Sequence, residues 1–177
     1  MQFELIDGGR LKVLAKELKR QAEGKQLRKD LVKELRTEGN RVRDRVRAAW
    51  LSAPSEGHAT ASAAREALPD LRKLLAKATR TQVRLTGKEA GVRVRTDGRK
   101  MPNRMRGLPR IVEGLGHAVD GRPGRWRHPV FGNPDVWVSQ RPFPRFYAAV
   151  RASDDMQERQ ACERAVEAMF QRIARTP

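Results

Sequence analysis

Cysteine is almost absent from this chain of 177 residues, since Cys162 is the only one. A single cysteine cannot form an internal disulfide, which is compatible with a reducing compartment. Histidine is nearly as scarce: His58, His117 and His128 lie far apart and show none of the spacings that zinc ligands adopt. We therefore expect neither a metal site nor a cofactor.

Long apolar runs are absent too. No segment approaches the roughly 18–20 apolar residues of a membrane-spanning helix, and MQFELIDGGR at the start lacks the two parts of a signal peptide. Neither glycine-rich phosphate-binding order, G-x-x-x-x-G-K-[ST] or G-x-G-x-x-G, occurs. We expect a protein made in the cytoplasm, with no membrane partner and no small-molecule substrate.

Residues suited to catalysis are few. Cys162 with His128 is the one conceivable nucleophilic pair, and the favoured interpretation of Cys162 is a small apolar filler in a helix. Asp154 and Asp155 suit the first turn of a helix better than acid–base chemistry. An enzyme such as a nuclease needs a metal or an acid–base cluster that the sequence lacks. We predict no catalytic residue and no enzymatic activity.

Aromatic residues make up only 5% of the chain, and hydrophobic residues 38%. The mean hydropathy is −0.72, so the core is modest and much surface faces solvent or a partner. Positive charge is abundant instead, with a formal net charge of +17. Such self-repulsion favours an anionic neighbour. Charge alone does not decide whether that neighbour is nucleic acid, an acidic protein surface or an anionic membrane.

The apolar pattern predicts helix over residues 10–51. Leucine and valine recur at spacings of three, four and seven, with charged residues between them, so one narrow stripe packs on a core. Gly24 and Gly39 interrupt the pattern, which indicates one kinked helix or two or three pieces. Residues 52–68 are small and polar and predict a flexible loop.

The period changes in the sheet region, residues 81–140. A helix beginning at Pro69 is expected to end near Arg80. Apolar and polar residues alternate over 81–86 and 90–96, which predicts a β-hairpin with an apolar face and a bare basic face. A basic loop follows at 97–110, and a short helix begins near Pro109. A strand is expected over 135–140. A last helix covers 145–175, with Glu158 on its polar side and Met156 on its apolar side. Residues 1–177 then form a single α+β domain, in which a small antiparallel sheet of three or four strands is flanked by a long N-terminal helix and a C-terminal helix.

The predicted hairpin of residues 81–96 and the basic loop at 97–110 carry many cations, which we expect to face a partner or DNA. One interpretation is contact with phosphates, and the other is ion pairing with an acidic protein surface. No aromatic residue interleaves these cations for base stacking, which favours the protein partner. The residues concerned are Arg84, Arg93, Arg95, Arg99, Lys100, Arg104 and Arg106.

The stretch RWRHPVFGNPDVWVSQ, residues 125–140, concentrates two of the three tryptophans in a segment punctuated by proline and glycine. Such a composition is typical of an interface anchor. The stretch with the PFPRF that follows resembles the C-terminal signature of a family of neck and tail-completion proteins of long-tailed bacteriophages. The residues that we assign to this signature, as structural and interface residues, are Trp126, Arg127, His128, Pro129, Val130, Phe131, Gly132, Asn133, Trp137, Gln140 and Phe146.

This resemblance implies a structural virion protein rather than an enzyme. Its relatives are small α+β subunits that form a homo-oligomeric ring, usually six-fold, at the head–tail junction or the top of the tail. The implied partners are copies of the chain itself, neighbouring neck and tail-tube proteins, and genomic DNA in the lumen. The chain would be assembled in the host cytoplasm and located in the virion. The sequence departs from the family at Arg141–Pro144, where many relatives have a glycine-rich turn, and a basic cytoplasmic nucleic-acid-binding protein stays as the alternative.

Overall fold

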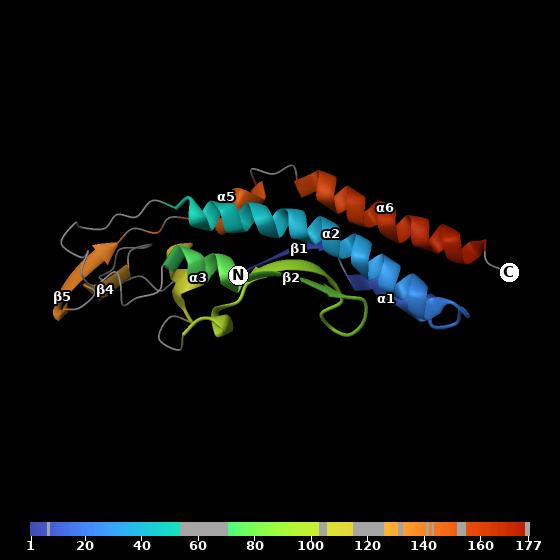
Figure 1. The fold of residues 1–177 in the computed structure, drawn as a ribbon, viewed down its shortest axis with the longest axis horizontal. Helices are drawn as coiled ribbons and strands as arrows, with labels where there is room; N and C mark the ends of the chain where they lie inside the picture. Colours follow the sequence, from blue (N-terminus) through green and yellow to red (C-terminus); the bar gives the residue numbers. More distant parts are fainter. Residues whose placement is uncertain are drawn as a thin grey trace. The chain divides into compact units, whose positions relative to one another are not determined.

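Helices make up most of the structure, which also contains a three-stranded sheet and a separate two-stranded sheet (Figure 1). The computed structural model describes residues 1–6, 8–53, 71–102, 106–114, 126–130, 133–140, 142, 144–151 and 155–175. The elements are β1 (Gln2–Ile6), α1 (Gly8–Leu18), α2 (Gly24–Leu51), α3 (Leu71–Ala78), β2 (Thr79–Arg84), β3 (Gly91–Thr96), η2 (Gly98–Lys100), α4 (Leu108–Val112), β4 (Trp126–Val130), β5 (Asn133–Gln140), α5 (Phe146–Arg151) and α6 (Asp155–Ala174). These elements confirm the predicted α+β class.

The chain divides into two compact units. The hairpin unit contains residue 1 and residues 46–79 and 96–149, with α3, α4 and the two-stranded sheet. The helix–sheet unit contains residues 2–45, 80–95 and 150–177, with α1, most of α2, most of the three-stranded sheet and α6. Each unit is described separately below.

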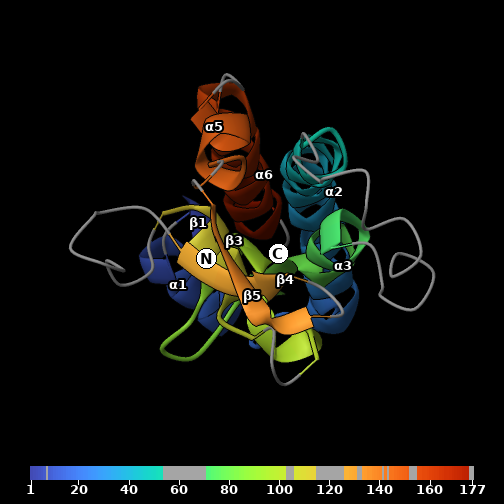
Figure 2. The same cartoon turned by 90° about the vertical axis from the view of Figure 1, so that its left-hand side faces the viewer.

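Helices α2 and α6 lie antiparallel in the helix–sheet unit (Figures 1 and 2). Arg45 pairs with Glu158 at 2.7 Å, and Asp30 pairs with Arg172 at 3.9 Å, so α2 and α6 run in opposite directions. Helix α6 also packs against α1 and β1. The apolar stripes meet in a core that includes Leu11, Leu14, Leu18, Leu27, Leu31, Leu35, Val42, Cys162 and Val166, all at most 4% exposed.

The three-stranded sheet has β3 in its middle, in the order β1-β3-β2. Strand β1 is antiparallel to β3, with Phe3 opposite Val94 and Glu4 opposite Arg93. Val92 and Val94 are fully buried, so the period-two pattern correctly identified the apolar face of β3. Strand β1 was not predicted, because five residues outside any repeated pattern carry too weak a signal.

Glycine at two positions decides how α2 begins and packs. A Cβ on Gly24 would lie 1.7 Å from the Leu18 carbonyl oxygen, so the tight turn between α1 and α2 requires glycine there. The helix continues through Gly39 without a break. This glycine lies in the middle of α2, where a Cβ would approach Thr81 Cγ2 at 2.5 Å and Val92 Cγ1 at 3.2 Å. The missing side chain therefore lets the helix backbone approach the sheet closely.

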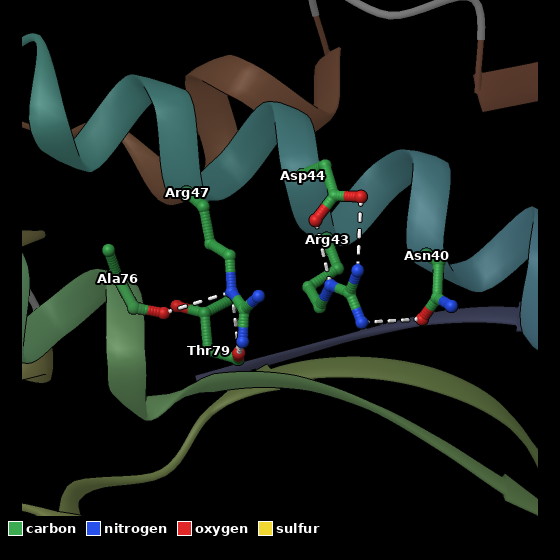
Figure 3. Close-up of polar contacts among 6 residues, drawn as sticks. All are labelled: Asn40, Arg43, Asp44, Arg47, Ala76 and Thr79. Atoms are coloured by element: carbon green, nitrogen blue, oxygen red, sulfur yellow. Dashed lines mark hydrogen bonds and ion pairs between the residues drawn. The ribbon is translucent and has the colours of Figure 1, made fainter.

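In the hairpin unit, Arg47 ties the end of α2 to the junction of α3 and β2 (Figure 3). Its guanidinium donates to the carbonyl oxygens of Ala76, at 3.1 Å, and Thr79, at 2.8 Å. The Ala76 carbonyl is one of the last in α3, and such groups lack helical partners. Thr79 Oγ1 also lies 2.8 Å from the hydroxyl of Thr96. These bonds satisfy buried polar groups where a helix passes directly into a strand.

A carboxylate far away in sequence caps α5. Glu113 Oε1 accepts hydrogen bonds from the backbone N–H of Arg145, at 2.6 Å, and of Phe146. The first N–H groups of a helix have no intrahelical acceptor, so this carboxylate substitutes for a local N-cap. It fixes the start of α5 next to the short helix α4, which begins as predicted near Pro109.

Several boundaries differ from the sequence predictions. Of the alternatives left open for residues 10–51, the structure has two helices, α1 and α2, whereas the single helix predicted over 145–175 is two helices, α5 and α6. The helix expected to end near Arg80 ends at Ala78, because Thr79 and Arg80 already pair in the sheet. Met156 was assigned to the apolar side of the last helix and is 61% exposed, whereas Glu158, assigned to the polar side, is 7% exposed. Most of the predicted loop 52–68 lies outside the described residues.

Candidate functional site

The signature residues form a β-hairpin rather than the loop expected before residue 135. Strands β4 and β5 are antiparallel, with Trp126 opposite Gln140, His128 opposite Val138 and Pro129 opposite Trp137. The register thus places the two halves of the signature directly opposite each other. Phe131 and Gly132, between the paired Val130 and Asn133, lie outside the described residues.

No third strand joins this pair among the described strands. An isolated two-stranded hairpin is at best marginally stable in water, and unpaired strand edges are templates for pairing with another chain. Proline at positions 129 and 134 removes two N–H donors from the hairpin. The arrangement can bind a protein by strand pairing or by packing.

Phe146 lies outside the hairpin, at the start of α5. Its side chain is fully buried, and its ring meets that of Tyr147 edge to face with centroids 5.2 Å apart. The Glu113 carboxylate holds the backbone N–H of Phe146. Phe146 therefore has a structural role within the hairpin unit.

The cations predicted to face a partner are largely engaged within the chain. Arg93 pairs with Glu4 at 3.0 Å and its side chain is only 16% exposed, so the basic face of the sheet is not bare at this position. Arg84 pairs with Glu89, and Arg99 with Asp97. Arg95 is half-buried, Lys100 and Arg106 are exposed, and Arg104 lies outside the described residues.

A second set of cations was not singled out from the sequence. Lys25, Arg28, Lys29, Lys33 and Arg36 lie on one exposed face of α2, and we call them the α2 basic face. They line one shallow depression of about 660 Å³ together with Val32, Thr37 and Asn40. None of these five cations forms an ion pair or side-chain hydrogen bond within the described part of the chain. Their i, i+3, i+4 spacing is the signal that would have identified them.

The later arginines of α2 differ from this face. Arg41 pairs with Glu38 at 2.8 Å. Arg43 pairs with Asp44 and also donates a hydrogen bond of 2.8 Å to the side-chain oxygen of Asn40 (Figure 3). Arg45 pairs with Glu158, and Arg47 donates to the carbonyl oxygens of Ala76 in α3 and Thr79 in β2. The free positive charge of α2 is therefore concentrated in its first half.

Cys162 lies in the core of the helix–sheet unit and is fully buried. Burial first, and then the negative charges of Glu38, Glu158 and Glu163, raise the pKa of its thiol to about 12. A thiol protonated at neutral pH is a poor nucleophile, which agrees with its interpretation as an apolar filler. Among the described residues, no three His, Cys, Asp or Glu side chains gather as metal ligands would.

Comparisons of the chain with protein-family models, with curated proteins and with solved structures give no match. In the part of the chain that the structure describes, no helix has the length and apolarity needed to cross a membrane. The contacts, burial and charges of the residues described above, with the resemblance of the signature, are therefore the basis for assigning a function.

Proposed function

We propose that this chain is a structural virion protein of a long-tailed bacteriophage that forms a homo-oligomeric ring at the head–tail junction or the top of the tail. The resemblance of residues 127–146 to neck and tail-completion proteins supports this assignment. The observation that carries it is the β4–β5 hairpin, which pairs the signature residues with each other and is joined by no third strand among the described strands.

The partner that we assign to this hairpin is a second copy of the chain. A two-stranded hairpin gains stability when a further strand or a packed surface covers it, and a ring supplies one neighbour on each side of every subunit. Ring closure by head-to-tail contacts uses two different complementary patches. In this proposal the hairpin is one of them, and the function consists of docking without any bond being made or broken.

Charge alone suggests a ring contact in which the basic hairpin of residues 81–96 and the first helix form one patch, and the acid-bearing last helix forms part of the other. Arg93 and Arg95 would be central to that contact. Glu158 and Glu167 of α6 instead pair with Arg45 and Arg10 of the same chain. Reversing the charge of Arg93 would also break its pair with Glu4, so this variant does not test assembly cleanly.

The test is the mass of the purified protein by light scattering, alone and with the neck and tail-tube proteins of the same phage. We expect a discrete ring-sized species, alone or when the partners are added. Trp137→Ser in β5 should abolish that species, whereas Val13→Ser, at an exposed position of α1, should leave it unchanged. Circular dichroism confirms that both variants keep their helices.

A protein that stays monomeric with every partner would contradict the proposal. Rings that form equally well in Trp137→Ser would show that the hairpin is not the contact. A monomer that ignores the partners and binds DNA would favour the alternative, a basic cytoplasmic nucleic-acid-binding protein.

A further inference from the structure

The α2 basic face has the dimensions of a surface that follows a phosphate backbone. Lys25 and Arg36, its end members, are eleven residues apart, which is roughly 17 Å at the rise of an α-helix. Duplex DNA carries about one negative charge per 1.7 Å of its axis. Five long cationic side chains over that length can each reach a phosphate. We propose that the α2 basic face binds the backbone of double-stranded DNA without reading its sequence.

Most carboxylates in the described part of the chain are already engaged within it, so few of them remain to pair with the basic face of a second copy. Nine carboxylates of the described part form ion pairs within the chain: those of Glu4, Glu17, Asp30, Glu38, Asp44, Glu89, Asp97, Glu158 and Glu167. Glu113 caps α5. Glu23, Glu34 and Glu163 are exposed and have no such partner among the described residues, but Glu34 lines a depression together with Lys33 of the basic face on the same chain. The five cations therefore call for an external polyanion.

An anionic membrane fits less well than DNA. Helices that lie on membranes insert an apolar face between the lipids. The apolar stripe along this part of α2, formed by Leu27, Leu31 and Leu35, is at most 4% exposed in the core of the helix–sheet unit. The basic face opposite them offers only Val32 as a half-buried apolar group. Attraction without insertion suits a solvated phosphate backbone.

This inference does not depend on ring formation, because all five cations belong to one helix of one chain. It also differs from the contact expected at the basic hairpin, where Arg84, Arg93 and Arg99 already have carboxylate partners. If the protein forms a ring, the same face gives that ring a defined surface for the DNA that passes through it.

The test measures binding of a fluorescent random-sequence DNA duplex to the full chain between 50 and 200 mM salt, a range that resolves counterion release. The variant K25Q/R28Q/K29Q/K33Q/R36Q removes five charges with a good helix former. Five lost phosphate contacts should weaken binding at least about tenfold and reduce the slope of log K against log salt by roughly 4.5. Single substitutions such as Lys29→Gln should each reduce the slope by about 0.9.

The matched control, K12Q/K19Q/K88Q/R110Q/R164Q, also removes three lysines and two arginines. All five are exposed and have no ion-pair partner in the described ranges. We expect this variant to lose clearly less affinity and slope than the α2 variant. Light scattering of both variants, run in parallel, reports assembly separately, so a failure to form rings and a failure to bind DNA are distinguished.

Three results would overturn the inference. Equal losses in the two variants would mean that overall charge, and not this face, attracts DNA. Polyglutamate that competes as well as the duplex at equal charge would indicate an acidic protein partner. Stronger binding of the wild type to anionic vesicles than to the duplex would indicate a membrane.

Discussion

The guanidinium of Arg45, on α2, donates a hydrogen bond of 2.7 Å to Glu158 Oε1, on α6. The side chain of Glu158 is 9% exposed and that of Arg45 37% exposed. The spacing of apolar residues in the sequence predicted that Glu158 faces solvent. The structure instead places Glu158 in the contact between the two longest helices, α2 and α6. A charge in that position is tolerated only because its partner is there.

Replacing Arg45 by methionine should destabilise the protein by roughly 1–3 kcal/mol, because the Glu158 carboxylate is left buried and unpaired. The double variant R45M/E158M should recover much of that loss, since an apolar pair of similar volume needs no desolvated charge. Urea denaturation of the two single variants and the double variant measures this coupling. Strictly additive losses would show that the two side chains do not depend on each other.

Stability should fall in acid partly through Glu158. Burial alone would raise the pKa of its carboxyl, but the hydrogen bond and charge of Arg45 outweigh burial and hold the pKa below its ordinary value of 4.5. The ionised form is therefore favoured by folding, so its contribution is complete above pH 4.5 and is lost as the pH falls through the folded pKa. Thermal melts of Glu158→Gln should show a weaker dependence on pH below 4.5 than the wild type. Glu34→Gln, at an exposed position, is the control, and an equal change there would contradict this explanation.

Cys162 should be inert in the native protein. Because burial moves the pKa of the thiol from 9.0 to about 12, its thiolate fraction at pH 8 falls roughly a thousandfold. Iodoacetamide should label it only in denaturant, as followed by mass spectrometry. Rapid labelling of the folded protein at pH 8 would mean that the core around α6 opens frequently.

Gly39 and Thr81 should behave as a coupled pair. Gly39→Ala normally stabilises an exposed helix by about 1 kcal/mol, but here the new Cβ meets Thr81 Cγ2 at 2.5 Å. We expect a net loss of roughly 1–3 kcal/mol from this overpacking. In a Thr81→Ala background, which removes the clashing methyl, the same substitution should cost clearly less. Chemical denaturation of the four proteins decides this, and equal losses in both backgrounds would contradict it.

Much of the fold followed from periodicity. The leucine stripe of α1 and α2, the alternation of Val92 and Val94, and the helix start near Pro109 were each predicted from local spacing, and the structure confirms them. Those features depend on a residue and its near neighbours in sequence. Strand β1 and the separation of α5 from α6 were not predicted.

The site was harder to predict for a physical reason. Whether a cation is available to a partner depends on which carboxylate lies beside it in the fold, and Glu4 is 89 residues from Arg93. Several of the arginines predicted to face a partner are therefore engaged within the chain. The α2 basic face was not predicted, because its spacing is visible in the sequence but its freedom from carboxylate partners is not.

The sheet order also dictates when the protein can finish folding. Strand β1 leaves the ribosome first, yet its partner β3 follows only after α1, α2 and α3. Bringing β1 and β3 together closes the long segment between them, which is entropically costly and slow compared with forming the helices within that segment. Helix α6, which follows all of these elements in the chain, then packs on β1. The nascent chain thus holds an unfinished helix–sheet unit until α6 has left the ribosome, and the completed surface of that unit becomes available to a neighbour only then.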